Sequence, residues 1–258
     1  MNQTSGAITT ALEDAAQLFR NAKHIVVLTG AGLSTPSGIP DFRSEGTGLW
    51  SSDEPMEVAS LATFRTHPER FFTWFRPLAG QIFHAKPNPA HEALAALEQD
   101  ERQITIVTQN IDGLHQKAGS THVIEMHGTL NTLTCTCCFK TFEAGDFLQP
   151  YIERGTIPLC SNCNGTLKPN VILFGEQLPQ AAWHEAQNAA RQCDLMLVAG
   201  SSLEVLPVAG LPVQAVDRGA HLIVINNTPT YINVRADIVL MDDVATVLPN
   251  IAKRATHG

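Results

Sequence analysis

The chain has 258 residues and a mass of 27.9 kDa, a length typical of one large domain or of a domain that carries insertions. Apolar residues make up 44% of it, enough for a substantial core, which excludes an intrinsically disordered chain. The net charge of −8 argues against nucleic acid as a partner, because phosphate contacts need clustered basic charge. No apolar run is long enough to predict a membrane-spanning helix, and no basic segment predicts a secretion signal, so we expect a cytoplasmic protein without a membrane partner. The sequence does not define the oligomeric state, and a monomer is compatible with it.

The predicted elements alternate between helices and short strands. A helix is expected first, because apolar residues recur at helical spacing from Ile8 to Ala22, and residues 10–13 read as a capping box (Thr-Ala-Leu-Glu). Asn88 and Pro89 predict the start of another helix, and a third is expected over residues 181–192. Short, continuously apolar runs predict buried strands at residues 24–29, 104–108, 123–126, 195–199, 222–225 and 238–240. This alternation indicates an α/β fold with a Rossmann-like parallel sheet.

Two stretches interrupt the alternation. The first contains no convincing strand, and its apolar residues between Phe71 and Phe83 (Phe71, Phe72, Phe75, Leu78, Ile82 and Phe83) predict a helix with a wide apolar face. The second is rich in cysteine and has short polar and β-like pieces. We therefore expect a Rossmann-like domain with two insertions, divided as 1–43, 44–86 (helical insert), 87–132, 133–169 (cysteine-bearing insert) and 170–258.

Four of the six cysteines form two pairs with the spacing of metal ligands: Cys135, Cys138, Cys160 and Cys163. Each pair can place two thiolates on one metal, and two pairs complete a closed tetrahedral site with no position for water. We therefore predict a structural zinc ribbon rather than a disulfide framework; a reduced cysteine group without metal is the alternative. Cys137 is left without a role, and Cys193 is expected in the core.

The first predicted strand runs into a long loop. Residues 30–35 read Gly-Ala-Gly-Leu-Ser-Thr, in which Thr35 replaces the third glycine of the dinucleotide-binding pattern. Glycines here let the backbone approach a pyrophosphate, but an ordinary tight turn explains them equally well. The loop continues to Arg43, which is longer than the roughly 2–6 residues usual between a strand and a helix. Its position favours a loop that covers a ligand.

Polar residues also follow the other predicted strands. Residues 109–115 read Gln-Asn-Ile-Asp-Gly-Leu-His, where Asp112 is explained equally well as a helix cap. His115 and His127 are both candidate bases, and His127 is favoured because it directly follows a strand. Residues 200–202 and 226–228 follow two further strands. Because the carboxyl ends of parallel strands meet at one edge of a sheet, these residues together predict a nucleotide site.

In this order, the motifs resemble those of the sirtuins, which remove acyl groups from protein lysines at the expense of NAD. The segments that carry the resemblance are 30–34, 37–43, 109–112, 127–128, the two cysteine pairs, 174–176, 200–203 and 225–226, and it extends from about residue 11 to 250. Residues 55–60 are reminiscent of a bacterial branch of the family. The resemblance implies a small inserted domain made of the zinc ribbon and the helical insert. It also implies a peptide that pairs as a strand with residues 171–176 and 204–206 in the cleft between the domains.

The resemblance also implies roles for individual residues. His127 is expected to be the general base, and Asn110 and Asp112 are expected to act with it on the nicotinamide side. The residues expected to bind NAD are Gly30, Ala31, Gly32, Thr35, Asp41, Phe42, Arg43, Gln109, Asn110, Ile111, Asp112, His127, Gly200, Ser201, Ser202, Asn226 and Val244. The residues expected to bind the substrate are Val171, Leu173, Phe174, Gly175, Glu176 and Leu206. NAD would be a co-substrate, zinc would be structural, and the partners would be proteins or peptides that contain acetyl-lysine.

The helical insert bears on which acyl group is removed. Relatives that prefer succinyl and malonyl groups carry a Tyr and, three residues later, an Arg, and the aligned positions here are Phe75 and Leu78. Without a phenol and a cation, an acidic acyl group would be buried unpaired. We therefore expect acetyl, or longer apolar acyl groups, to be preferred. An NAD-dependent ADP-ribosyltransferase and an inactive NAD-binding adaptor are the alternative functions.

Overall fold

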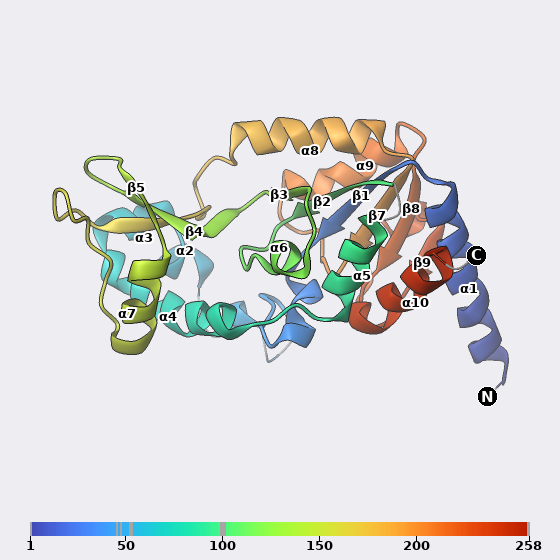
Figure 1. Ribbon diagram of the computed structural model, residues 1–258, viewed down its shortest axis with the longest axis horizontal. Coiled ribbons are helices and arrows are strands. Elements are labelled where there is room, and N and C mark those ends of the chain that lie inside the picture. Colours follow the sequence, from blue (N-terminus) through green and yellow to red (C-terminus); the bar gives the residue numbers. More distant parts are fainter. Residues whose placement is uncertain (1, 45, 47, 52–53, 99–101, 257–258) are drawn as a thin grey trace.

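The computed structural model describes residues 2–44, 46, 48–51, 54–98 and 102–256. It has a larger α/β part, which carries both termini, and a smaller part at the other end of the long axis (Figure 1). None of the helices in the described ranges is long and apolar enough to span a membrane.

Six parallel strands form the sheet of the larger part, and all six predicted strands are confirmed. They are β1 (His24–Thr29), β2 (Gln103–Thr108), β3 (Val123–Glu125), β7 (Leu195–Ala199), β8 (His221–Ile225) and β9 (Ile238–Leu240). Their spatial order is β3-β2-β1-β7-β8-β9, as in a Rossmann fold. Because the order reverses between β1 and β7, the loops that leave these two strands diverge and open a crevice at the carboxyl edge of the sheet.

Helices cover both faces of this sheet (Figure 1). One face packs against α1 (Asn2–Asn21), α5 (Pro89–Glu98) and α10 (Val244–Thr256), and the other packs against α8 (Gln180–Gln192) and α9 (Leu211–Val216). A short helix, α6 (Leu114–Ala118), follows β2. Since both faces are covered, the strands can be apolar along their whole length, which is why they are visible in the sequence. Cys193 lies in the second of these cores, as expected.

One predicted helix start is wrong and another is confirmed. Helix α1 begins at Asn2, so Thr10 lies inside it and the capping box does not mark its start. Nothing between these positions stops a helix, because the stretch lacks proline and its single glycine costs only about 1 kcal/mol. At α5, the side-chain oxygen of Asn88 accepts a hydrogen bond from the Ala90 N–H at 2.9 Å, so the predicted cap is present.

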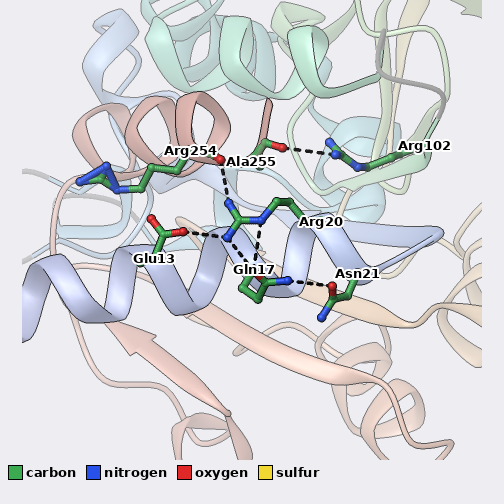
Figure 2. A network of polar contacts seen from close by, with 7 residues as sticks. All are labelled: Glu13, Gln17, Arg20, Asn21, Arg102, Arg254 and Ala255. Carbon is green, nitrogen blue, oxygen red and sulfur yellow. Dashed lines mark hydrogen bonds and ion pairs between the residues drawn. The ribbon is translucent and has the colours of Figure 1, made fainter. Parts of the chain in front are cut away.

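Arg20 joins the first helix to the last (Figure 2). Its guanidinium donates to the Arg254 carbonyl at 2.8 Å and to the Glu13 carboxylate at 2.7 Å, while Arg102 donates to the Ala255 carbonyl at 3.3 Å. Carbonyls in the last turn of a helix lack partners within the helix, so these arginines satisfy the end of α10.

The smaller part is built from both insertions. The first contributes α2 (Pro55–Val58), α3 (Leu61–Thr66) and α4 (Pro68–His84), and the second contributes β4 (Gly128–Cys135), β5 (Thr141–Glu143), α7 (Gly145–Arg154) and β6 (Leu167–Val171). The three strands of the second insertion form an antiparallel sheet in the order β5-β4-β6. This sheet extends beyond the expected boundaries of 133 and 169, because β4 begins soon after β3 ends and β6 continues toward the larger part.

The two insertions pack on each other. The Arg76 guanidinium of α4 donates to the carbonyls of Ile152 and Glu153 in α7, at 2.8 and 2.7 Å, and the Tyr151 hydroxyl donates to the Phe72 carbonyl. The predicted apolar face of α4 is buried except at Phe83, which is 43% exposed. Phe83 follows buried Ile82 directly, and one residue turns the side chain by about 100°, away from that face.

Candidate active site

A cavity of about 980 Å³ lies at the carboxyl edge of the parallel sheet and reaches into the smaller part. Its lining is polar where the loops after the parallel strands meet, with Ser34, Gln109, Ser201 and Asn226 among the residues. It is apolar where the helical insert contributes Phe71, Trp74, Phe75, Leu78 and Ile82. One cavity therefore offers a polar compartment and an apolar one.

The loops after β1 and β7 touch each other at their glycines. The Gly32 N–H donates to the Gly200 carbonyl at 2.9 Å, and the Gly30 N–H donates to the Ala199 carbonyl at 3.3 Å. A Cβ on Gly32 would lie 2.9 Å from the Gly200 oxygen. These glycines therefore allow close approach of the chain to itself, which explains them without a ligand. The contact with a pyrophosphate stays a prediction.

Asn110 and Asp112 are buried and joined to the loop after β1. The Ser34 hydroxyl donates to Asp112 Oδ2 at 2.7 Å, and the Asn110 amide donates to Ser34 Oγ and to the Gly30 carbonyl at 3.1 and 3.0 Å. Asp112 Oδ1 accepts the Leu114 N–H at 2.9 Å, so this carboxylate also satisfies the first N–H of α6, from the position before the N-cap Gly113. The capping and site explanations of Asp112 therefore hold together, since each of its oxygens has a different partner.

His127 lines the cavity in a defined tautomer. Its Nδ1 lies 2.9 Å from the Gln109 carbonyl oxygen. Because a carbonyl only accepts hydrogen bonds, Nδ1 carries the proton and Nε2 keeps its lone pair. Burial lowers the pKa of His127 below its usual 6.5, an effect that the Gln109 carbonyl partly opposes. The imidazole is therefore neutral at pH 7 and able to accept a proton.

His115, the other candidate base, is a core residue, and that prediction is wrong. Its side chain is 1% exposed, its Nε2 lies 3.0 Å from the Thr29 hydroxyl, and its ring packs on His91. Burial lowers the pKa of His115 to about 3. Lying on a short helix rather than directly after a strand, it points into the core between α5 and the sheet and does not line the cavity.

The cavity brings together all but one of the residues expected to bind NAD. Gln109 donates to Ser201 Oγ at 3.0 Å, and the Arg43 guanidinium pairs with Glu204 across the opening at 2.6 Å. The residues that line it are Gly30, Ala31, Gly32, Thr35, Asp41, Phe42, Arg43, Gln109, Asn110, Ile111, Asp112, His127, Gly200, Ser201, Ser202 and Asn226. Val244 packs in the core and does not line the cavity, so the cavity gives no support to its expected contact with adenine.

All six residues expected to bind the substrate line the same cavity: Val171, Leu173, Phe174, Gly175, Glu176 and Leu206. Their segment is pinned from both sides, because the Ile172 N–H donates to the His127 carbonyl and the Phe174 N–H donates to the Ala59 carbonyl, at 2.8 and 3.0 Å. Glu176 accepts the Leu173 N–H at 2.7 Å and pairs with Lys168 at 2.9 Å. This makes the segment a fixed edge of the cavity.

Sequence reasoning missed Trp50, Trp74 and Lys168. Both tryptophans line the cavity, and Lys168, which does not line it, forms an ion pair with Glu176. Trp74 lies three residues after Phe71 and four before Leu78, so helical spacing alone gave a signal for it. Trp50 and Lys168 lie outside any periodic pattern, and only the tertiary structure brings them to the site.

The four predicted metal ligands converge. The sulfur atoms of Cys135, Cys138, Cys160 and Cys163 lie within 4.8 Å of one another. Zn–S bonds of about 2.3 Å in a tetrahedron put sulfurs about 3.8 Å apart, close to the 3.4 and 3.7 Å of two of these pairs. The residues therefore fit a structural zinc ion, with Cys137 outside the set.

Fold and site thus define an α/β nucleotide-binding protein with a cysteine-rich metal-binding insertion. The model of the Sir2 family matches residues 30–207. The chain is 42% identical to the NAD-dependent protein deacylase 2 of Archaeoglobus fulgidus, over 94% of this chain and 95% of that protein. It is 45% identical to an NAD-dependent protein deacetylase of Chromobacterium violaceum, over 87% of this chain and 90% of that protein.

Solved Sir2 structures also match the fold of this chain. One, solved for the mechanism and regulation of Sir2 enzymes, superposes with a TM-score of 0.90 at 41% identity, over 96% of this chain and 98% of that one. Another, Sir2Af2 with a myristoylated histone peptide, gives 0.83 at 36% identity, over 96% and 97%. The chain belongs to the Sir2 family.

Proposed function

We propose that this chain is an NAD-dependent protein-lysine deacetylase, which transfers the acetyl group of acetyl-lysine to the ADP-ribose of NAD and releases nicotinamide, O-acetyl-ADP-ribose and free lysine. One observation carries the proposal. His127, neutral and with Nε2 as its free acceptor, lines a cavity that joins a polar, nucleotide-sized compartment to an apolar one. Family membership supports the same activity, since the relatives named above are NAD-dependent deacylases and deacetylases.

The polar compartment is suited to NAD. Both side-chain N–H groups of Asn110 are donated to protein acceptors, so its Oδ1 is left to accept from a ribose hydroxyl or an amide. Asp112, which is fixed by Ser34 and lines the cavity with Ile111, would hold the nicotinamide carboxamide together with that residue. The remaining lining residues between Gly30 and Arg43, together with Gly200, Ser201 and Ser202, would surround the rest of the dinucleotide.

The acyl oxygen of the substrate displaces nicotinamide from the ribose, and His127 then acts on the ribose. Its Nε2 removes the proton of a ribose hydroxyl, whose oxygen attacks the acyl carbon. The lysine amine then leaves with a proton, and water adds to the acyl carbon, so that its bond to the anomeric oxygen breaks and O-acetyl-ADP-ribose is released. A base in this position contributes about 10²–10⁴-fold to the rate. Phe42, which lines the cavity beside Arg43, shields the reacting carbon from water.

The apolar compartment sets the acyl preference. Phe75 and Leu78 are buried, and both line the cavity, so an acidic acyl group would meet neither a cation nor a phenol there. We infer that acetyl and longer apolar acyl groups are substrates and that succinyl and malonyl groups are not. Sir2 structures bound to a propionylated and to a myristoylated peptide support this range of acyl groups.

The peptide would lie along residues 171–176 and 204–206, of which Leu206 is 77% exposed and available to a partner. Zinc, held by the four cysteines, would stabilise the second insertion and take no part in the reaction. We propose the division of the chain into a Rossmann-like domain and two insertions on the boundaries given above, except that the second insertion extends from the start of β4 at 128 to the end of β6 at 171. The cytoplasmic location stays a prediction, and a monomer stays compatible with the sequence.

The test is incubation of the chain with NAD and an acetyl-lysine peptide, after which the mass of the peptide and the amount of nicotinamide released are measured. Loss of an acetyl group that requires NAD and accompanies nicotinamide release is the expected result. A peptide that gains the mass of ADP-ribose would identify a transferase instead. NAD binding without either change would identify an adaptor. Either outcome contradicts the proposal.

A further inference from the structure

A stack of aromatic rings runs along the apolar side of the cavity. The Trp50 ring lies between Phe42 and Trp74, with centroid distances of 5.1 and 5.4 Å and planes inclined by 28° and 10°. The ring of Phe174 meets Trp50 at 6.1 Å with an angle of 60°. All four rings line the cavity and are half-buried, so a molecule bound there contacts them directly.

The rings that meet at Trp50 come from separate parts of the chain. Phe42 belongs to the loop after β1, Trp74 to α4 of the helical insert, and Phe174 to the segment after β6. The backbone holds Trp50 in place, since its N–H donates to the Phe42 carbonyl at 2.9 Å. Beyond Trp74, the Phe71 ring lies 6.3 Å away and is tilted by 52°, and it in turn stacks on Phe75 at 5.1 Å. Trp50 thus joins the nucleotide, acyl and peptide sides of the site.

Phe42 depends on this contact. Within the described parts of the chain, Trp50 is the one aromatic ring that stacks on Phe42. Trp74, in contrast, is also held by Phe71 and Phe75. Because offset-stacked pairs contribute energy beyond the area that they bury, the position of Phe42 responds to that of Trp50.

We propose that Trp50 is a positioning residue, which transmits occupancy of the acyl compartment to Phe42 and so restricts the breakage of NAD to moments when an acyl-lysine is bound. This inference rests on the proposed function. An acyl chain that packs on Trp74 and Phe71 fixes the Trp50 ring from one side, and Trp50 then holds Phe42 over the reacting ribose carbon. Longer apolar chains cover more of the stack and hold it more firmly.

Without that support, water competes with the acyl oxygen. A water oxygen then bonds to the ribose carbon, the bond to nicotinamide breaks with its electron pair going to nicotinamide, and water loses one proton. The products are ADP-ribose, nicotinamide and H⁺, with the peptide still acylated. The ratio of nicotinamide released to lysine deacylated therefore measures how well Phe42 is held.

The experiment compares this ratio in the wild-type chain and in Trp50→Leu, with acetyl and decanoyl peptides. We expect a wild-type ratio near one that is lowest with the decanoyl peptide. The Trp50→Leu variant should raise the ratio by roughly 2- to 10-fold, the range that stacking energies give, and should lose its dependence on chain length. Trp50→Phe, which keeps a stacking ring, should restore most of the coupling.

Phe83→Leu is the matched control, because Phe83 is an exposed aromatic residue of α4 outside the cavity. A ratio that stays at the wild-type value in Trp50→Leu, with only a lower rate, would show a structural role and overturn the inference. If Trp50→Leu does not fold, the same ratio is measured in Trp74→Leu, which removes the ring that stacks on the other face of Trp50. An unchanged ratio in that variant would likewise overturn the inference. Failure of the wild-type chain to deacylate any peptide would instead refute the proposed function.

Discussion

The contact between the loops after β1 and β7 gives a prediction about stability. Gly200 has a φ of +61°, and a Cβ there would lie 2.2 Å from the Leu33 nitrogen and 2.6 Å from the Gly32 carbonyl carbon. Both atoms are backbone, so the loop itself would have to move in Gly200→Ala. Gly38 supplies the matched control, because its φ is +84° and nothing lies within 4 Å of its Cβ position.

The two substitutions share one cost and differ in the other. A left-handed conformation costs a residue with a side chain roughly 1–2 kcal/mol, which applies to both. Forcing an atom into a filled space adds about 1–3 kcal/mol, which applies only to Gly200→Ala. We therefore expect a loss of about 1–2 kcal/mol for Gly38→Ala and about 2–5 kcal/mol for Gly200→Ala.

Thermal unfolding followed by circular dichroism measures the difference. At roughly 2–4 °C per kcal/mol for a chain of this size, Gly200→Ala should unfold several degrees below Gly38→Ala. Equal losses in the two variants would show that the contact between the loops is not tight, and would refute the reasoning.

Three other predictions concern the site. His127→Ala should lower the rate of deacylation by about 10²–10⁴-fold with little change in the unfolding temperature, and near-normal turnover of the variant would exclude His127 as the base. Because burial holds the pKa of His127 below 6.5, the wild-type kcat/KM should rise with pH through that lowered pKa and be level by pH 7. Elemental analysis should find about one zinc per chain, which Cys138→Ser loses and Cys137→Ser keeps, and equal zinc in both variants would reject the ligand set. Phe75→Tyr combined with Leu78→Arg should gain deacylation activity on succinyl peptides and lose at least about tenfold of the activity on decanoyl peptides. An unchanged ratio of the two activities would show that these positions do not contact the acyl group.

Local patterns predicted the features of this molecule that are themselves local. The six strands were visible because helices bury both faces of the sheet and leave few polar positions in them. The zinc ligands were visible because each cysteine pair is defined by a spacing of a few residues. The helix α7, which lies between the two pairs, was not predicted. Its Tyr151 and its carbonyls find their partners on α4, which is distant in the sequence.

Predictions that depend on where a side chain points fared differently. His115 and His127 were both candidates from sequence, and only packing distinguishes the buried ring on α6 from the one at the cavity. The Gly-Ala-Gly segment matched a phosphate-binding pattern, yet its glycines are required by the approach of Gly200, from a loop that is distant in the sequence. Trp50 gave no signal, because its partners lie in three segments that meet only in the folded chain.

The fate of the acyl group tests the central claim most directly. With NAD and an acetyl-lysine peptide, mass spectrometry of the small-molecule products distinguishes acetyl bound to ADP-ribose from free acetate. We predict O-acetyl-ADP-ribose in an amount equal to the lysine deacylated. Free acetate as the first product, with NAD unconsumed, would contradict the account, because the joined compartments and His127 would then have no role in acyl transfer.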